Sequence, residues 1–179
     1  MNYRSISTTP ITEKPPVIDK LNPKIIILSG KVDSGKTSTL TRWVDTWQTL
    51  GLQIGGVLTA AVMDRDKKIG YDLIDINSGN EYPLVRSKPF DQSWQMGRFF
   101  FDKTGFNLLH DKISRQCAKD LYILDEIGPL EMIKKQGLYA IFIHLLQQHS
   151  SSLLLVVRES TVQAVCAFIE HHDNSTMLI

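Results

Sequence analysis

The sequence predicts an α/β fold of three layers, in which helices cover both faces of a mostly parallel central sheet. Three unbroken apolar runs, KIIILS at 24–29, LYILD at 121–125 and SLLLVV at 152–157, are typical of strands buried on both faces. Amphipathic segments with apolar residues at three- and four-residue spacing separate these runs. Strands that alternate with helices favour parallel pairing, because each crossover helix packs back onto the sheet.

The individual elements follow from local patterns. Residues 1–22 are polar and rich in proline, so we expect a flexible leader before a single domain at 23–179. Three short strand-like runs lie at 53–62, 71–79 and 80–87, and the first two are joined by a hairpin signal at 64–70, which indicates antiparallel pairing. The remaining expected elements are helices at 36–50, 104–120, 131–148 and about 162–169, and an edge strand at 176–179.

The composition excludes several classes of protein. A chain of 179 residues with 42% hydrophobic and 22% charged residues is typical of one globular domain. The net charge of +1 gives no general attraction to nucleic acid, and neither a signal sequence nor a run of about 20 apolar residues occurs, so no membrane partner is expected. Cys117 and Cys166 lack metal-ligand spacing. We expect buried thiols in a reducing, cytoplasmic compartment and leave any protein partner open.

The segment GKVDSGKT at 30–37 satisfies the P-loop pattern of Gly, four variable residues, Gly, Lys and Ser or Thr. Glycines let the backbone amides wrap a phosphate, and the following helix presents its positive end to the anion. Lys36 would reach the β and γ phosphates, and the Thr37 hydroxyl would bind Mg²⁺. The predicted nucleotide-binding residues are Gly30, Lys31, Val32, Asp33, Ser34, Gly35, Lys36, Thr37 and Ser38.

Two acidic residues end the second buried strand. A P-loop site requires a carboxylate at the end of a neighbouring strand for the Mg²⁺ shell, and Asp125 stands at that point. Glu126 would face the γ-phosphate, where it could orient and deprotonate the attacking water. Alone, this acidic pair could also cap the next helix or lie in solvent. Its occurrence with the P-loop favours a site for hydrolysis.

At this point the sequence resembles a known family. The stretch DEIGPLE at 125–131, with weaker similarity in GGVLT at 55–59, IGYDLIDINSG at 69–79 and MGRFFFD at 96–102, is similar to the small nucleoside-triphosphatases that include the human cancer-related nucleoside-triphosphatase and thermophilic relatives. The resemblance covers about 24–170.

The resemblance implies a RecA-like P-loop fold of the additional-strand, catalytic-glutamate type. It also implies Mg²⁺-dependent hydrolysis of ATP, GTP and other nucleoside triphosphates to diphosphates, with Asp125 in the metal shell and Glu126 on the water. Two departures stand out: Asp33 replaces a usual glycine, and Ala61 replaces the glutamate of a Thr-x-Glu segment that begins at Thr59. A carboxylate at position 33 would repel phosphates unless it turned outward or paired with Lys31.

Arg158 follows the third buried strand, where it could stabilise charge on the γ-phosphate or form a surface ion pair with Glu159 or another neighbour. Two other functions remain open. A P-loop kinase would use Glu126 or Asp125 to activate a nucleoside or polynucleotide hydroxyl, although no arginine-rich lid segment occurs between 131 and 160. A nucleotide-binding switch or accessory module would bind tightly with little turnover.

Overall fold

The structure is a computed structural model that describes residues 5–9, 14–30 and 36–175. Within these ranges nine strands form one sheet, in the order β1-β2-β9-β8-β3-β4-β5-β7-β6. The strands are β1 (Ser5–Thr9), β2 (Lys24–Gly30), β3 (Ile54–Asp64), β4 (Lys67–Asp75), β5 (Glu81–Arg86), β6 (Ser93–Met96), β7 (Phe99–Asp102), β8 (Leu121–Ile127) and β9 (Ser152–Arg158). The helices are α1 (Lys36–Thr49), α2 (Lys103–Ser114), α3 (Pro129–Lys134), α4 (Tyr139–Leu146) and α5 (Val162–Ser175), with a 3₁₀ turn η1 (Glu159–Thr161) before α5.

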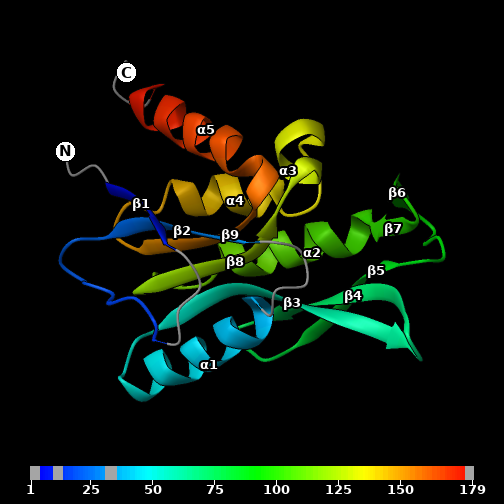
Figure 1. Ribbon diagram of the computed structural model, residues 1–179, viewed down its shortest axis with the longest axis horizontal. Coiled ribbons are helices and arrows are strands. Elements are labelled where there is room, and N and C mark those ends of the chain that lie inside the picture. Colours follow the sequence, from blue (N-terminus) through cyan, green and yellow to red (C-terminus); the bar gives the residue numbers. More distant parts are fainter. Residues whose placement is uncertain (1–4, 10–13, 31–35, 176–179) are drawn as a thin grey trace.

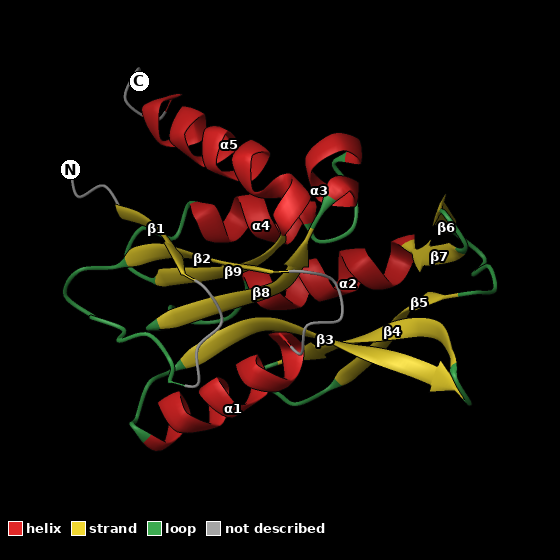
Figure 2. Cartoon of the chain, in the orientation of Figure 1, coloured by secondary structure: helices red, strands yellow, loops and turns green. Residues whose placement is uncertain are grey.

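The sheet has a parallel half and an antiparallel half. Strands β1, β2, β9, β8 and β3 pair in parallel, whereas β3-β4, β4-β5, β5-β7 and β7-β6 pair antiparallel (Figure 2). The predicted α/β fold with parallel and antiparallel strands in one sheet is confirmed, but the sheet is not mostly parallel, because four of its eight strand pairings in the described residues are antiparallel. The carboxyl ends of β2, β9 and β8 lie at one edge, where ligands of open α/β sheets bind.

Helices cover the two faces of the sheet unequally. Helix α1 lies on one face, and α2, α3, α4 and α5 lie on the other (Figure 1). Below the sheet, Trp43 and Trp47 of α1 meet edge to face at 5.8 Å between ring centroids and pack on Ile26 and Leu28 of β2. Above it, α4 and α5 pack on the opposite side of the same strands. Because residues on both faces are buried, the apolar runs of β8 and β9 are continuous.

Several sequence expectations differ from the structure. Residues 5–9, assigned to a flexible leader, form edge strand β1 beside β2, and Trp47 Nε1 donates a hydrogen bond to Pro16 O at 3.1 Å. The helix expected at 131–148 is two helices, because Lys135 and Gly137 adopt positive φ angles of 52° and 64°. Cys117 is exposed, not buried. The expected strand at 176–179 lies outside the described residues.

The hairpin of β6 and β7 has no counterpart among the expected strands. No helix in the described ranges is long and apolar enough to cross a membrane.

Candidate active site

The site begins where β2 ends and α1 starts. Gly30, the last residue of β2, pairs in register with Arg158 at the end of β9. Helix α1 begins at Lys36, with half-buried Thr37 and exposed Ser38 in its first turn. The assignment of the P-loop residues to the phosphates stays a prediction, because the described residues do not include Lys31, Val32, Asp33, Ser34 and Gly35 or the side chain of Lys36.

Asp125 joins three elements at the carboxyl edge of the sheet. Its side chain is only 2% exposed, and Oδ2 accepts hydrogen bonds from Thr37 Oγ1 at 2.9 Å and from Thr59 N at 3.1 Å. The Thr59 hydroxyl donates in turn to Asp125 O at 2.8 Å. The carboxylate is therefore fixed against the first turn of α1, and its place in a metal shell stays a prediction.

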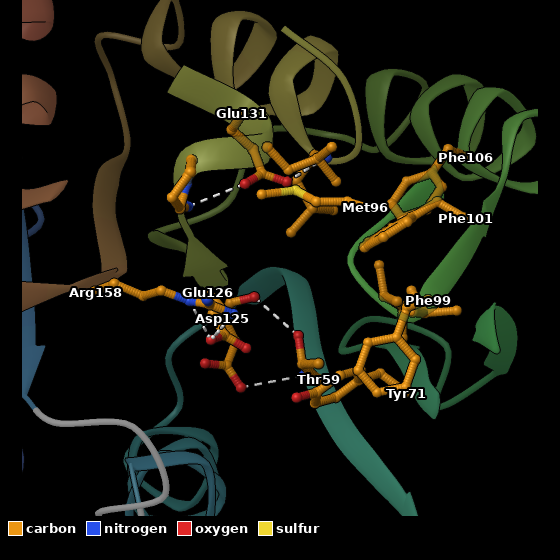
Figure 3. A pocket seen from close by; sticks show the side chains of 16 residues that line it. Thr59, Tyr71, Met96, Phe99, Phe101, Phe106, Asp125, Glu126, Glu131 and Arg158 are labelled. Carbon is orange, nitrogen blue, oxygen red and sulfur yellow. Dashed lines mark hydrogen bonds and ion pairs between the residues drawn. The ribbon is translucent and has the colours of Figure 1, made fainter. Parts of the chain in front are cut away.

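Glu126 occupies a bulge in β8. Between Leu124 and Ile127 the strand advances three residues while β9 advances two, from Leu155 to Val157. Glu126 itself has a φ of +77°, which side-chain-bearing residues rarely adopt. Bulges of this kind redirect side chains next to functional sites. The bulge allows the Glu126 side chain to lie beside Asp125 at the edge of the sheet (Figure 3).

Arg158 contacts Glu126 and not its sequence neighbour Glu159. Its Nε and Nη2 atoms both lie 2.8 Å from Glu126 Oε1, and the two side chains are 42% and 28% exposed. An ion pair this exposed contributes little stability, roughly 0–1 kcal/mol. The ion pair instead sets the geometry of the site, because it fixes one oxygen of Glu126 and holds the arginine of β9 beside it.

A further carboxylate at the site, Glu131, was missed as a functional candidate. It is 5% exposed at the start of α3, where Oε2 accepts from Gly128 N at 2.9 Å and Oε1 accepts from Leu138 N at 3.2 Å. Burial raises the pKa of Glu131 to about 7, and the nearby charge of Glu126 adds to the rise. The signal in the sequence is the glutamate three residues after Gly128, at the N3 position of α3, where a glutamate can accept from the backbone N–H of the N-cap residue.

A cavity of about 310 Å³ opens beside the carboxylates of Asp125 and Glu126. Its polar end is formed by Thr59, Asp125, Glu126 and Arg158, and its other end is apolar (Figure 3). The apolar walls come from β4, β5, the β6-β7 hairpin, α2, α3 and the N-cap of α4. They include Tyr71, Leu73, Val85, Met96, Phe99, Phe101, Phe106, Leu130 and Leu138. No local sequence pattern predicts this cavity, because its walls meet only through pairing between distant strands.

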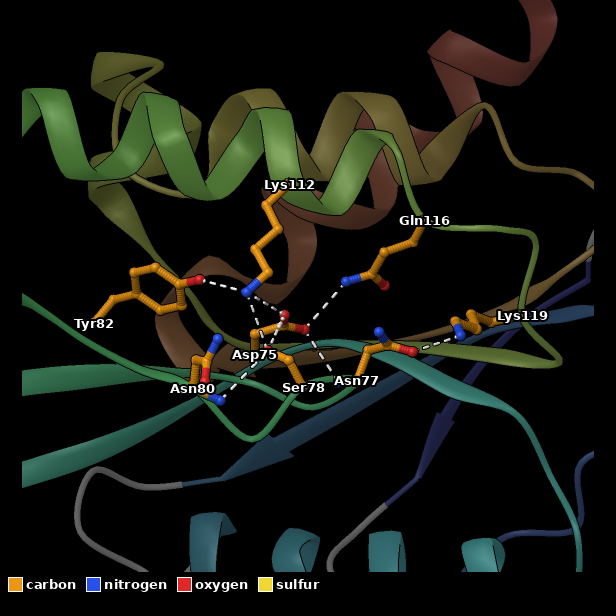
Figure 4. A network of polar contacts seen from close by, with 8 residues as sticks. All are labelled: Asp75, Asn77, Ser78, Asn80, Tyr82, Lys112, Gln116 and Lys119. Atoms are coloured by element: carbon orange, nitrogen blue, oxygen red, sulfur yellow. Dashed lines mark hydrogen bonds and ion pairs between the residues drawn. The ribbon is translucent and has the colours of Figure 1, made fainter.

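A second polar cluster lies away from this edge. Asp75 is fully buried at the end of β4, where it accepts from Ser78 Oγ at 2.6 Å and from Gln116 Nε2 at 3.1 Å (Figure 4). Lys112 Nζ lies 3.5 Å from Asp75 Oδ2 and donates to Tyr82 Oη at 2.8 Å. This cluster ties α2 to the turn between β4 and β5, and its buried charge is paired. We interpret it as structural.

The sequence of this chain also matches a known protein family. A family model described as NTPase matches residues 25–179. The chain belongs to the NTPase family. The match includes β2, α1, β8 and β9, the elements that position Thr37, Asp125, Glu126 and Arg158. The resemblance stated from DEIGPLE is therefore confirmed.

Individual relatives of this NTPase-family chain are distant. It is 33% identical over 118 residues to nucleoside-triphosphatase THEP1 of Metallosphaera sedula, covering 66% of this chain and 62% of the relative. It is 24% identical to nucleoside-triphosphatase THEP1 of Methanopyrus kandleri, covering 62% and 61%, and 26% identical to the cancer-related nucleoside-triphosphatase homolog of Mus musculus, covering 65% and 66%. The chain thus spans about three fifths of the length of the first two relatives.

Solved structures of the family share the fold. The solution structure of a human cancer-related nucleoside triphosphatase matches with a TM-score of 0.59 at 23% identity, covering 75% of each chain. The crystal structure of THEP1 from the hyperthermophile Aquifex aeolicus matches with a TM-score of 0.59 at 20% identity, covering 81% of this chain and 82% of that one. At these identities the likeness supports the P-loop NTPase fold and nothing finer.

Proposed function

We propose that this protein hydrolyses nucleoside triphosphates to the diphosphate and phosphate, with Mg²⁺ as cofactor and Glu126 as the base for water. The observation that carries the proposal is the hydrogen bond of 2.9 Å between Thr37 Oγ1 and Asp125 Oδ2. It joins the last residue of the P-loop motif to a strand 88 residues further along the chain. Family membership and the names of the relatives point to the same activity.

The described residues fit Mg²⁺. This ion takes oxygen ligands, keeps several waters and uses one or two protein carboxylates together with substrate phosphates. The Thr37 hydroxyl and the Asp125 carboxylate supply such oxygens side by side, and Thr59 N holds Asp125 in place. When bound, the ion would neutralise charge on the β and γ phosphates.

Glu126 and Arg158 supply the remaining groups. Both hydrogen bonds from Arg158 end on Glu126 Oε1. Glu126 Oε2 has no hydrogen-bond partner among the described residues, so it can accept a proton from water. The water oxygen then attacks the γ phosphorus while the bond to the bridging oxygen breaks. Arg158, 42% exposed and at the register of Gly30, can turn toward the γ-phosphate as charge develops there.

Phosphate release tests the proposal. The intact protein is incubated with ATP, GTP, CTP or UTP and Mg²⁺, beside Lys36→Ala and Glu126→Gln, with nucleotide binding measured in parallel. The exposed Glu81→Gln is the matched control. We expect Glu126→Gln to bind nucleotide and to release phosphate at least about 100-fold more slowly, and Lys36→Ala to lose binding.

Two results would count against the proposal. Full turnover in Glu126→Gln would remove that residue from the reaction. Tight binding without phosphate release by the intact protein would indicate a nucleotide switch in place of a hydrolase.

A further inference from the structure

The cavity beside Glu126 is far larger than a hydrolase requires. A water molecule occupies about 30 Å³ of the liquid, whereas the cavity measures about 310 Å³. That volume is at the lower end of the range for sites that bind small organic molecules. The attacking water alone does not account for it.

The walls of the cavity favour an apolar ring. Tyr71 and Phe99 meet edge to face at 5.6 Å between centroids, and Phe101 and Phe106 meet at 6.3 Å. Tyr71, Phe99 and Phe101 are half-buried, so part of each ring is accessible. Aromatic rings prefer such offset or edge-to-face neighbours over a parallel sandwich. A planar apolar body would therefore be well accommodated between these side chains.

The polar groups converge at one end and carry net negative charge. Of the described lining residues, the charged ones are Asp125, Glu126, Glu131 and Arg158, and Arg158 is already paired with Glu126. An anionic occupant of the cavity, away from the oxygens of Thr37 and Asp125 that would hold Mg²⁺, would be repelled by this net charge. The occupant should be neutral, with a polar group at the Glu126 end and little polarity elsewhere.

The apolar part of the cavity lies on the side of β8 away from the P-loop strand β2. Its walls there include residues of β4, β5 and β7, whereas Arg158 is the one described lining residue from β9 and none comes from β2. The proposed function places the γ-phosphate toward Glu126, so the nucleoside would lie at the other end of the triphosphate. We therefore expect the base of the nucleotide to lie outside the cavity.

We propose that this cavity is the subsite for a phosphoryl acceptor, a neutral aromatic alcohol whose hydroxyl reaches Glu126 while its ring lies between Tyr71 and Phe101. The inference rests on the proposed function, because it places the γ-phosphate at Glu126. The alcohol oxygen forms the bond to the γ phosphorus as the bond to the bridging oxygen breaks. The hydroxyl proton passes to the Glu126 carboxylate and then to solvent, leaving a phosphate monoester and a nucleoside diphosphate. Water takes the place of the alcohol when the cavity is empty.

The test uses benzyl alcohol as the probe, with ATP, Mg²⁺ and the intact protein. ³¹P NMR distinguishes benzyl phosphate from inorganic phosphate, so transfer and hydrolysis are followed in one reaction. The matched probe is 4-(hydroxymethyl)benzoate, which has the same alcohol with a negative charge. We expect benzyl phosphate to form, and at least about tenfold less monoester from the charged probe.

A variant that fills the cavity tests whether phosphoryl transfer to benzyl alcohol takes place there. Val85 is 3% exposed and lines the cavity, so the larger ring of Val85→Phe can occupy the space that the probe would use. Transfer to benzyl alcohol should fall at least about tenfold. A melting curve reports whether the variant folds. If it does not, Phe99→Leu is measured instead: it removes one ring of the half-buried aromatic wall, and transfer should again fall.

The outcomes separate the two proposals. Inorganic phosphate without benzyl phosphate at saturating alcohol overturns the acceptor subsite and leaves the hydrolase intact. Displacement of benzyl alcohol by ADP, followed by ligand-observed NMR, would assign the cavity to the nucleotide's base and also overturn the inference. Absence of both phosphate products overturns the hydrolase and the acceptor subsite together.

Discussion

Replacing Glu131 with Gln should change how the folding stability of this protein depends on pH. The side chain is 5% exposed, and its two oxygens accept from Gly128 N and Leu138 N. Burial raises the pKa of Glu131 from 4.5 to about 7. Desolvation disfavours the charged form, and this effect outweighs the two backbone hydrogen bonds that favour the carboxylate.

The sign and size of the effect follow from proton linkage. The folded state binds the proton of Glu131 more tightly than the unfolded state does, so protonation stabilises the fold. This contribution is fully present below the unfolded pKa of 4.5 and is lost as the pH rises through about 7. At about 1.4 kcal/mol per pKa unit, the contribution is at most about 3 kcal/mol.

Urea denaturation of the wild type and Glu131→Gln at pH 5, 6, 7 and 8 measures this contribution. Glutamine cannot accept from both backbone donors as the glutamate does, and leaving one donor unsatisfied costs about 1–3 kcal/mol at every pH. The informative quantity is therefore how the difference in unfolding free energy between the wild type and Glu131→Gln changes with pH. We expect the advantage of the wild type to shrink by up to about 3 kcal/mol between pH 5 and 8. The exposed Glu81→Gln is the control. A difference that stays flat from pH 5 to 8 would refute the reasoning.

Two further pairs of variants test backbone geometry, each by urea denaturation. Glu126→Gly should be more stable than Glu126→Ala by about 1 kcal/mol, because the φ of +77° is strained for any residue with a Cβ; the opposite order would mean that the bulge relaxes. Gly56→Ala should lose more than about 3 kcal/mol, because its Cβ would lie 2.0 Å from Ile123 O. Gly79→Ala, with positive φ but nothing within 4 Å, should lose only about 1 kcal/mol, and equal losses would argue against the clash.

The parallel half of the fold could be predicted because its signals are local. The apolar runs of β2, β8 and β9 are continuous, since helices cover both of their faces, and α1 follows the glycine-rich motif directly. The pairing of Thr37 with Asp125 could be anticipated as well, because a P-loop needs a carboxylate from a neighbouring strand.

The strands that the sequence patterns did not predict form through contacts between residues far apart in the chain. Residues 5–9 are polar and form a strand only because the edge of β2 is available for pairing. The β6-β7 hairpin joins β5 through two residue pairs, Val85 with Phe101 and Arg86 with Phe100. No local pattern specifies such pairings. The aromatic cavity could not be predicted for the same reason, although Phe99, Phe100 and Phe101 stood out as a run.

The bulge in β8 explains how two consecutive acidic residues can serve one site. In a regular strand, neighbouring side chains point to opposite faces, so Asp125 and Glu126 would diverge. The extra residue between Leu124 and Ile127 and the positive φ of Glu126 break this alternation. The strain of about 1 kcal/mol brings no evident gain in packing, because Glu126 is 28% exposed and its ion pair with Arg158 is weak. Residues in strained conformations cluster at functional sites, where the surrounding structure holds them. The strain at Glu126 is therefore independent support for the chemical role that we propose for its carboxylate.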